Sequence, residues 1–160
     1  MVFLSTLVTY LILKNKSMKL NQAGLKALHN REGLELAPYL DTKGVPTIAM
    51  GNTYYLDGRP VTLKDRKLTL VEANALSATT AERFDKEVDN LVTSNVNQNQ
   101  YNALVSFTYN VGVNGFRTST ALRLINRNPN DHNIASALMM WVKDKELIGR
   151  RCEEIKQYFS

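Results

Sequence analysis

Apolar residues recur at the period of an amphipathic helix over much of this chain. Asn21 can cap a short first helix that runs to about residue 29 or 31. A longer helix is predicted from Thr69 to about Val92, because Thr69 and Glu72 have the spacing of a capping box. The apolar pattern of this second segment favours a long helix that joins two parts of the fold.

The densest helical pattern follows Asn97 and Asn99, either of which can serve as an N-cap. From Tyr101 to Tyr109, apolar residues cover most of the circumference of the predicted helix. Such a helix usually forms the buried centre of a bundle. Glycines at 112 and 115 are predicted to end it.

Three shorter helices are predicted after this central one. They are a segment from Thr118 or Ser119 to Leu124, a helix with Ile134, Leu138, Trp141 and Val142 on one face, and a last helix from Arg150 to Phe159. Gly149 is predicted to break the chain between the last two.

Residues 37–62 have a different pattern, in which three prolines argue against a helix. Short runs rich in β-formers at 47–50 and 53–56 predict strands, and Asp57-Gly58 predicts a tight turn after the second. Together, the segments predict one α+β domain with a small β lobe, a larger helical lobe, a long helix joining them and a cleft between.

Composition narrows the possible partners without choosing among them. The net charge of +5 and the sequence pI of about 9.4 favour polyanions such as nucleic acid, membrane surfaces or acidic cell-wall polymers. Cys152 is the single cysteine, so an intrachain disulfide is impossible, and we expect it to be a small packing residue in a helix. With only two histidines and no clustered thiols, no zinc site or other metal site is expected.

The first 17 residues are set apart by an almost continuous apolar run from Met1 to Leu13. The run is shorter than the roughly 20 residues that span a bilayer, so no stable membrane span is expected. It also lacks the basic start and small-residue cleavage site of a secretory signal. It can be an upstream extension before a start at Met18, a weak signal-anchor, or an added strand or helix. The first is favoured, which leaves residues 18–160 as the folded domain.

Candidate chemistry is concentrated in the segment from Glu32 to Ile48. Glu32 is followed nine residues later by Asp41, and Thr47 comes six residues after that. Two carboxylates suit glycosidic bond cleavage, in which one donates a proton to the leaving oxygen and the other helps water attack. Each residue also has an ordinary structural explanation: a helix-end acid, a turn residue and a strand residue.

The combination resembles the active-site segment of phage-type lysozymes, the endolysins or muramidases of glycoside hydrolase family twenty-four. Residues 100–112 resemble the second signature of this family, 116–120 the short helix after it, and Trp141 with 149–153 its C-terminal pattern. The resemblance covers about residues 19–159.

The resemblance implies hydrolysis of the β-1,4 bond between N-acetylmuramic acid and N-acetylglucosamine in peptidoglycan, with inversion and without a cofactor. Glu32 is then the general acid, and Asp41 with Thr47 positions the attacking water. Inverting enzymes keep their carboxyl groups about 6.5–9.5 Å apart to admit that water.

The resemblance also implies sugar contacts for Tyr109, Asn110 and Ser119. Tyr109 can equally be half core and half cleft, and Ser119 can be a helix N-terminal residue. Arg150 and Arg151 can meet acidic wall groups or pair in solvent with the following acids at 153 and 154, the second being favoured for at least one of them.

The chain departs from the family pattern Thr-Ile-Gly-x-Gly-His at two positions. Ala49 stands where a glycine is usual, and Asn52 stands where a histidine is usual. These changes affect cleft shape and local stability more than the proposed chemistry.

Three other functions stay open on the sequence: a lysozyme-like module that binds the wall without cutting it, a basic nucleic-acid-binding domain, and a lytic transglycosylase. No Arg-rich helix or zinc-finger pattern supports nucleic-acid binding. The favoured function predicts a monomer that waits in the host cytoplasm and reaches the periplasm and cell wall through a pore-forming holin.

Overall fold

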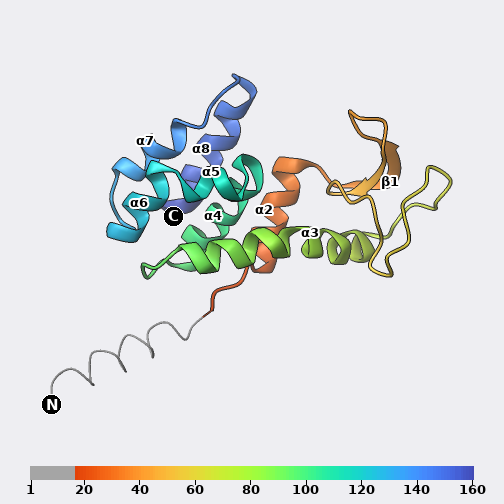
Figure 1. Ribbon diagram of the computed structural model, residues 1–160, viewed down its shortest axis with the longest axis horizontal. Helices are drawn as coiled ribbons and strands as arrows, with labels where there is room; N and C mark the ends of the chain where they lie inside the picture. The colour runs from red at the N-terminus through yellow and green to blue at the C-terminus, as the bar shows by residue number, and fades with distance from the viewer. Residues whose placement is uncertain (1–16) are drawn as a thin grey trace, which may run out of the picture.

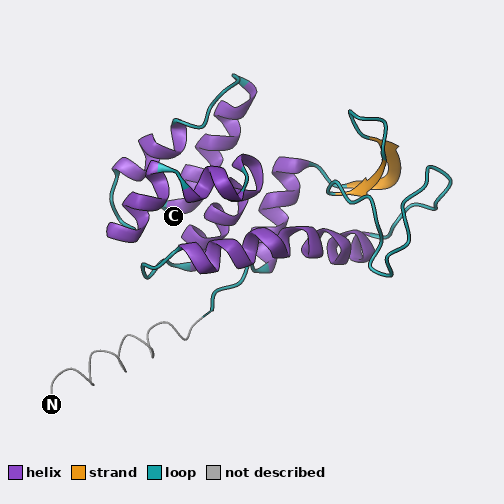
Figure 2. Cartoon of the chain, viewed as in Figure 1, coloured by secondary structure: helices purple, strands orange, loops and turns teal. Residues whose placement is uncertain are grey.

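The computed structural model describes residues 17–160, which form a group of helices at one end and a small hairpin at the other (Figures 1 and 2). The elements in chain order are α2 (Gln22–Glu32), β1 (Glu35–Leu40), β2 (Pro46–Ala49), α3 (Leu70–Leu91), α4 (Gln98–Val111), α5 (Val113–Arg117), α6 (Thr120–Arg127), α7 (Asn133–Met139) and α8 (Glu146–Tyr158). This arrangement confirms the predicted lysozyme-like α+β fold. The expectation of an apolar N-terminal extension falls outside the described residues, apart from Ser17.

The long helix α3 begins at the predicted capping box. Thr69 accepts a hydrogen bond from the backbone of Glu72, and the Glu72 side chain accepts one from the backbone of Thr69. The helix contacts both strands and also packs on α4. Figure 1 shows it extending from the β region to the helical part of the molecule. It therefore joins the two lobes, as the sequence predicts.

Helix α4 is the centre of the helical lobe. It contacts α2, α3, α5 and α8, and its residues from Gln100 to Thr108 are all buried. Phe107 packs edge-on against both Phe116 and Trp141, with each pair of ring centroids 6.1 Å apart. Apolar residues cover most of its circumference, as expected for a central helix, and buried polar residues such as Ser106 have hydrogen-bond partners, which is why the sequence identifies α4 so clearly.

The hairpin of β1 and β2 is antiparallel, with Tyr39 opposite Thr47. An irregularity interrupts the register between Glu35 and Tyr39, where Pro38 has no N–H to donate to the partner strand. Ile48 on β2 is fully buried in a second apolar cluster, which α3 completes. The hairpin is thereby fixed to the N-terminal half of α3.

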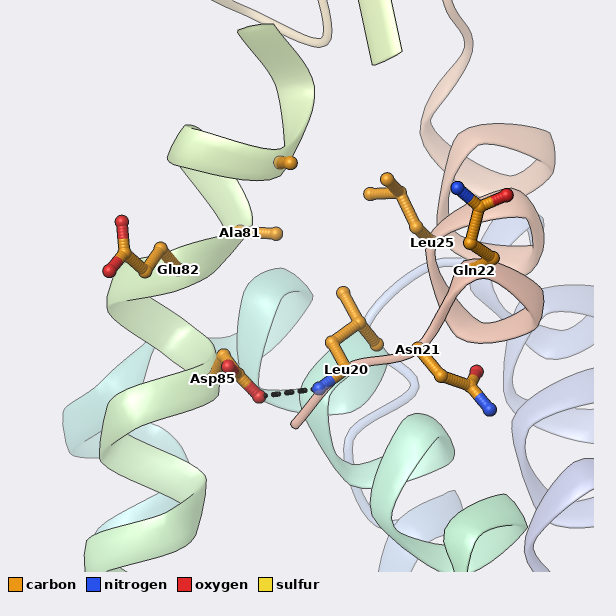
Figure 3. A pocket seen from close by; sticks show the side chains of 8 residues that line it. Leu20, Asn21, Gln22, Leu25, Ala81, Glu82 and Asp85 are labelled. Atoms are coloured by element: carbon orange, nitrogen blue, oxygen red, sulfur yellow. Dashed lines mark hydrogen bonds between the residues drawn. The ribbon is translucent and has the colours of Figure 1, made fainter. Parts of the chain in front are cut away.

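Two aspartates of α3 hold the chain just before α2. The Asp85 carboxylate accepts a hydrogen bond from the Leu20 backbone at 2.8 Å (Figure 3). It accepts another from the buried Tyr101 hydroxyl at 2.8 Å. Asp89 accepts one from the Met18 backbone at 2.9 Å. The start of α2 is therefore tied to α3 by charged hydrogen bonds.

Four local predictions are wrong. Trp141 and Val142 lie beyond α7, which ends at Met139, and so do not extend its apolar face. Residues 53–56 form no strand, since only a single bridge joins Tyr54 to Pro60 around the predicted Asp57-Gly58 turn. Gly149 lies inside α8 and does not break it, because packing against α4 outweighs the cost of about 1 kcal/mol for a helical glycine. Cys152 is exposed, since the period of α8 points 151, 154 and 158 inward instead.

Within residues 17–160, no helix has both the length and the apolar character needed to cross a bilayer.

Candidate active site

Glu32 is the last residue of α2, and the backbone turns sharply after it. Gly33 takes a positive φ of 84° and donates its N–H to the His29 carbonyl, which ends the helix. A positive φ of this kind favours glycine, so Gly33 ends the helix directly after the candidate catalytic residue Glu32. The Glu32 side chain is 21% exposed, which leaves it accessible at the junction of helix and hairpin.

Arg150 of α8 forms an ion pair with Glu32, with 2.5 Å between Nη2 and Oε1. Burial alone would lower the pKa of Arg150, but hydrogen bonding and charge from Glu32, with help from Glu154, raise it above its ordinary value. The arginine therefore stays charged and holds the Glu32 carboxylate in place.

Arg150 and Arg151 do pair with an acid of α8, but the prediction that this pairing is exposed to solvent is wrong. Both arginines do bond Glu154, but Arg151 and Glu154 are fully buried. Glu153 instead lies 3.4 Å from Arg31. Sequence reasoning treats two adjacent arginines as surface charges, and only their partners on α2 and α4 give them a buried role.

Tyr109 connects the surroundings of Glu32 to the end of the hairpin. Its hydroxyl donates to the Met50 carbonyl at 3.0 Å, and its ring packs 4.8 Å from that of Phe84. Burial, followed by the nearby charge of Glu32, raises the pKa of Tyr109 to about 12. These contacts make Tyr109 partly buried, and its contact with sugar stays a prediction.

Asp41 and Thr47 are both anchored to Val45 in the hairpin loop. Asp41 Oδ1 accepts hydrogen bonds from the backbones of Lys43 and Val45, each at 2.8 Å. The Thr47 hydroxyl donates to the Val45 carbonyl at 2.9 Å, and the same carbonyl accepts the Asp41 N–H at 3.0 Å. Within residues 17–160 the second carboxylate oxygen of Asp41 makes no hydrogen bond. The loop thus fixes both side chains and leaves an acceptor available.

Tyr39 is a neighbour of this group that sequence reasoning misses. It lies opposite Thr47 in the hairpin, and burial, then the charges of Glu35 and Asp41, raise its pKa. The only signal in the chain is that Tyr39 precedes Asp41 by two residues, since Asp41 lies just past the end of β1.

The other two predicted sugar contacts have structural bonds. Asn110 accepts a hydrogen bond from Arg151 with 2.5 Å between Oδ1 and Nη2. Ser119 caps α6, because its buried hydroxyl accepts the Leu122 N–H at 3.0 Å and donates to the Phe116 carbonyl at 2.8 Å. Contact of either residue with sugar stays a prediction.

Both departures from the family pattern lie at the end of the hairpin, where Ala49 is the last residue of β2 and Asn52 follows it. Ala49 has a φ of 54°, the left-handed region that a non-glycine residue seldom adopts. Asn52 donates to the Thr80 hydroxyl at 2.6 Å and to the Leu76 carbonyl at 3.3 Å. Ala49 is therefore a strained position, while Asn52 ties the loop to α3.

The described part of the chain contains no group of three or more side chains that could bind a metal. Two pockets of the structure are lined by residues other than Glu32, Asp41 and Thr47. One lies between the start of α2 and α3 (Figure 3), and the other lies between α2 and α8.

Comparison with known proteins agrees with the fold and the motifs. The phage lysozyme family model matches residues 29–154. The endolysin of Salmonella phage P22 is 33% identical over 147 residues, covering 89% of this chain and 99% of that protein. The SAR-endolysin of Pseudomonas phage phiKMV is 35% identical over 144 residues, covering 84% and 83%. A crystal structure of a P22 lysozyme mutant superposes with a TM-score of 0.82 at 32% identity and covers 89% of this chain and 99% of that one. The chain therefore belongs to the phage lysozyme family of peptidoglycan hydrolases.

Proposed function

We propose that this protein is an inverting muramidase, which cleaves the β-1,4 bond between N-acetylmuramic acid and N-acetylglucosamine. The observation that carries the proposal is that both carboxyl groups of the motif are held in place by contacts of their own. Glu32 is held by Arg150 at the end of α2, and Asp41 is held by the backbone of the hairpin loop that follows.

Glu32 acts as the general acid and protonates the oxygen of the leaving sugar. Asp41 acts as the general base, and its Oδ1 is held in place by two backbone N–H groups. Its second oxygen takes the proton of the attacking water. The bond to the leaving oxygen breaks as water attacks the opposite face of the anomeric carbon, which inverts the configuration.

Thr47 orients the water through an acceptor. Its hydroxyl proton is committed to the Val45 carbonyl, so the Thr47 oxygen can only accept a hydrogen bond from the water. One water proton then points to Thr47 and the other to Asp41. A lone pair of the water is left to face the sugar.

Sugar binding is proposed for side chains around these three residues. Tyr109 and Tyr39 offer partly buried rings beside Glu32 and Asp41, and aromatic faces pack well on sugar C–H groups. Asn110 and Ser119 are proposed to contact sugar as well. No cofactor takes part in this mechanism.

In the host, residues 18–160 are proposed to act as a monomeric catalytic domain. The enzyme waits in the cytoplasm and reaches the peptidoglycan after a holin opens the inner membrane. Wild-type cells and holin-null cells carrying the gene, compared for lysis, test this route; equal lysis would overturn it.

The reaction is tested with purified peptidoglycan, comparing the wild type with Glu32→Gln. Glu146→Gln is the matched control, because it makes the same change at an exposed position of α8. Turbidity loss by the wild type and the control but not by Glu32→Gln supports the proposal. Mass spectrometry must then find reducing muramic acid ends, and NMR must detect the α-anomer first. Anhydro ends would establish a transglycosylase instead, and wall binding without lysis a non-catalytic module.

A further inference from the structure

Behind the Arg150–Glu32 pair lies a second carboxylate, that of Glu154, which is fully buried. Glu154 Oε1 accepts hydrogen bonds from Arg150 Nε at 3.0 Å and from the Ser106 hydroxyl at 2.7 Å. Its other oxygen bonds Arg151. Each oxygen of this carboxylate therefore has a charged partner.

The four ionic groups form a continuous chain of alternating sign. The order is Glu32, Arg150, Glu154 and Arg151, with Asn110 bonded to the far side of the last arginine. Opposite charges alternate and sum to zero, which is how a low-dielectric interior can hold them. Only Glu32, the outermost group, is one that the proposed reaction uses directly.

Arg150 is held at several points of its guanidinium group. Glu154 fixes Nε, while Nη2 contacts both Glu32 at 2.5 Å and the Ser106 carbonyl at 3.2 Å. A planar guanidinium with one edge fixed has little freedom left to move the opposite end. The position of the Glu32 carboxylate therefore depends on contacts made within α4 and α8.

We propose that Glu154 is a positioning residue for the hydrolysis. It fixes Arg150 and pairs with part of the positive charge of that arginine, so that Arg150 orients Glu32 without pairing with Glu32 alone. The proposal rests on the proposed role of Glu32 as the general acid. Glu154 itself does not touch the substrate, because its side chain is wholly buried.

The charge of Glu154 has a consequence for proton transfer. Without it, Glu32 is the one carboxylate among residues 17–160 that Arg150 contacts, and the guanidinium is no longer fixed at Nε. Proton transfer needs the reacting carboxyl group at a set position, so a less firmly held Arg150 should slow the step. Other charged or titratable groups beside these four ionic residues are Arg31, Tyr39 and Tyr109.

The test is Glu154→Gln, which keeps the shape and most hydrogen bonds but removes the charge. Steady-state rates on soluble peptidoglycan fragments are measured across pH, together with thermal melting. We expect kcat to fall about 10- to 100-fold with KM nearly unchanged, as for a small displacement of a reacting group.

Ser106→Ala is the matched control, since it removes a hydrogen bond to the same Glu154 oxygen but keeps the charge. It should lower the melting temperature and leave kcat and KM close to those of the wild type. A Glu154→Gln protein that melts early but keeps the wild-type kcat would reduce Glu154 to a structural residue and overturn the proposal.

Glu32→Gln is measured beside them to separate two failures. If Glu32→Gln stays active, the proposed function fails; if it is inactive while Glu154→Gln is unaffected, only the positioning role fails. Should Glu154→Gln not fold, Glu154→Asp keeps the charge and shortens the reach toward Arg150. The proposal then requires a reduced kcat at constant KM, and a wild-type kcat would contradict it.

Discussion

The Tyr109 hydroxyl donates a 3.0 Å hydrogen bond to the Met50 carbonyl, which joins the central helix α4 to the loop after β2. This bond crosses between the two lobes on the side where Glu32 lies, because the Glu32 charge acts on the same phenol. A single side chain thus couples the buried bundle to the hairpin that carries Asp41 and Thr47.

Tyr109 should make the protein less stable at high pH. Its pKa is about 12 in the folded state against an ordinary value of 10.0, so between these values only the unfolded chain has lost the proton. The contribution of Tyr109 to the free energy of unfolding is therefore complete below pH 10 and is lost as the pH rises toward 12. Denaturant unfolding of Tyr109→Phe across this range should have a shallower pH slope than the wild type. An equal slope would contradict the assignment.

His29 should make the protein less stable at low pH. Its side chain is buried, and desolvation lowers its pKa below the ordinary 6.5. As pH falls below 6.5, the unfolded chain binds a proton that the folded one resists, so stability falls by at most about 1.4 kcal/mol per pH unit.

The comparison of His29→Gln with His132→Gln checks this expectation, because His132 is the exposed histidine of the chain. Unfolding free energies between pH 7 and 5 should fall less steeply in the first variant than in the wild type. The second variant should follow the wild type, and equal slopes in all three proteins would contradict the prediction.

Replacing Ala49 with glycine, the residue that the family usually has at this position, should stabilise the protein. At the φ of 54° that Ala49 adopts, a residue other than glycine destabilises the fold by about 1–2 kcal/mol. Burial of the Ala49 methyl group stabilises it by about 0.8 kcal/mol. Ala49→Gly should therefore raise the free energy of unfolding by up to about 1 kcal/mol. Ala49→Val should lower it by more than about 2 kcal/mol, because a β-branched residue is a genuine outlier in this region. Chemical denaturation measures both, and a destabilised glycine variant would disprove the strain.

The sequence predicts the helices of this fold well because most of them carry local signals. The capping box at Thr69 and Glu72, the caps Asn21 and Asn97, and the apolar circumference of α4 each act within a few residues. The failed predictions depend on distant partners. Gly149 stays helical because α8 packs on α4, a contact that no local pattern encodes.

The same division applies to the candidate site. Motif spacing identifies Glu32, Asp41 and Thr47, but the partners of these residues come from elsewhere in the chain. Arg150 lies more than a hundred residues from Glu32, and its charge alone does not reveal a buried partner. Tyr39 had a local signal, whereas Glu154 could be recognised only from its complete burial.

Thr47 should act through its oxygen and not through its methyl group. Because the hydroxyl donates to the Val45 carbonyl, Thr47→Ser keeps both this bond and the acceptor that faces the proposed water. Thr47→Val keeps the volume but loses both, and it also leaves that carbonyl with one donor fewer at a site where the side chain is buried. We expect kcat to fall by about 10- to 100-fold in Thr47→Val, as for a misplaced reactant, and by much less in Thr47→Ser. Rates are to be measured at equal concentrations of folded protein, judged by circular dichroism. If the two variants lose activity equally, the water is oriented by some other group, and Asp41 alone would have to position it.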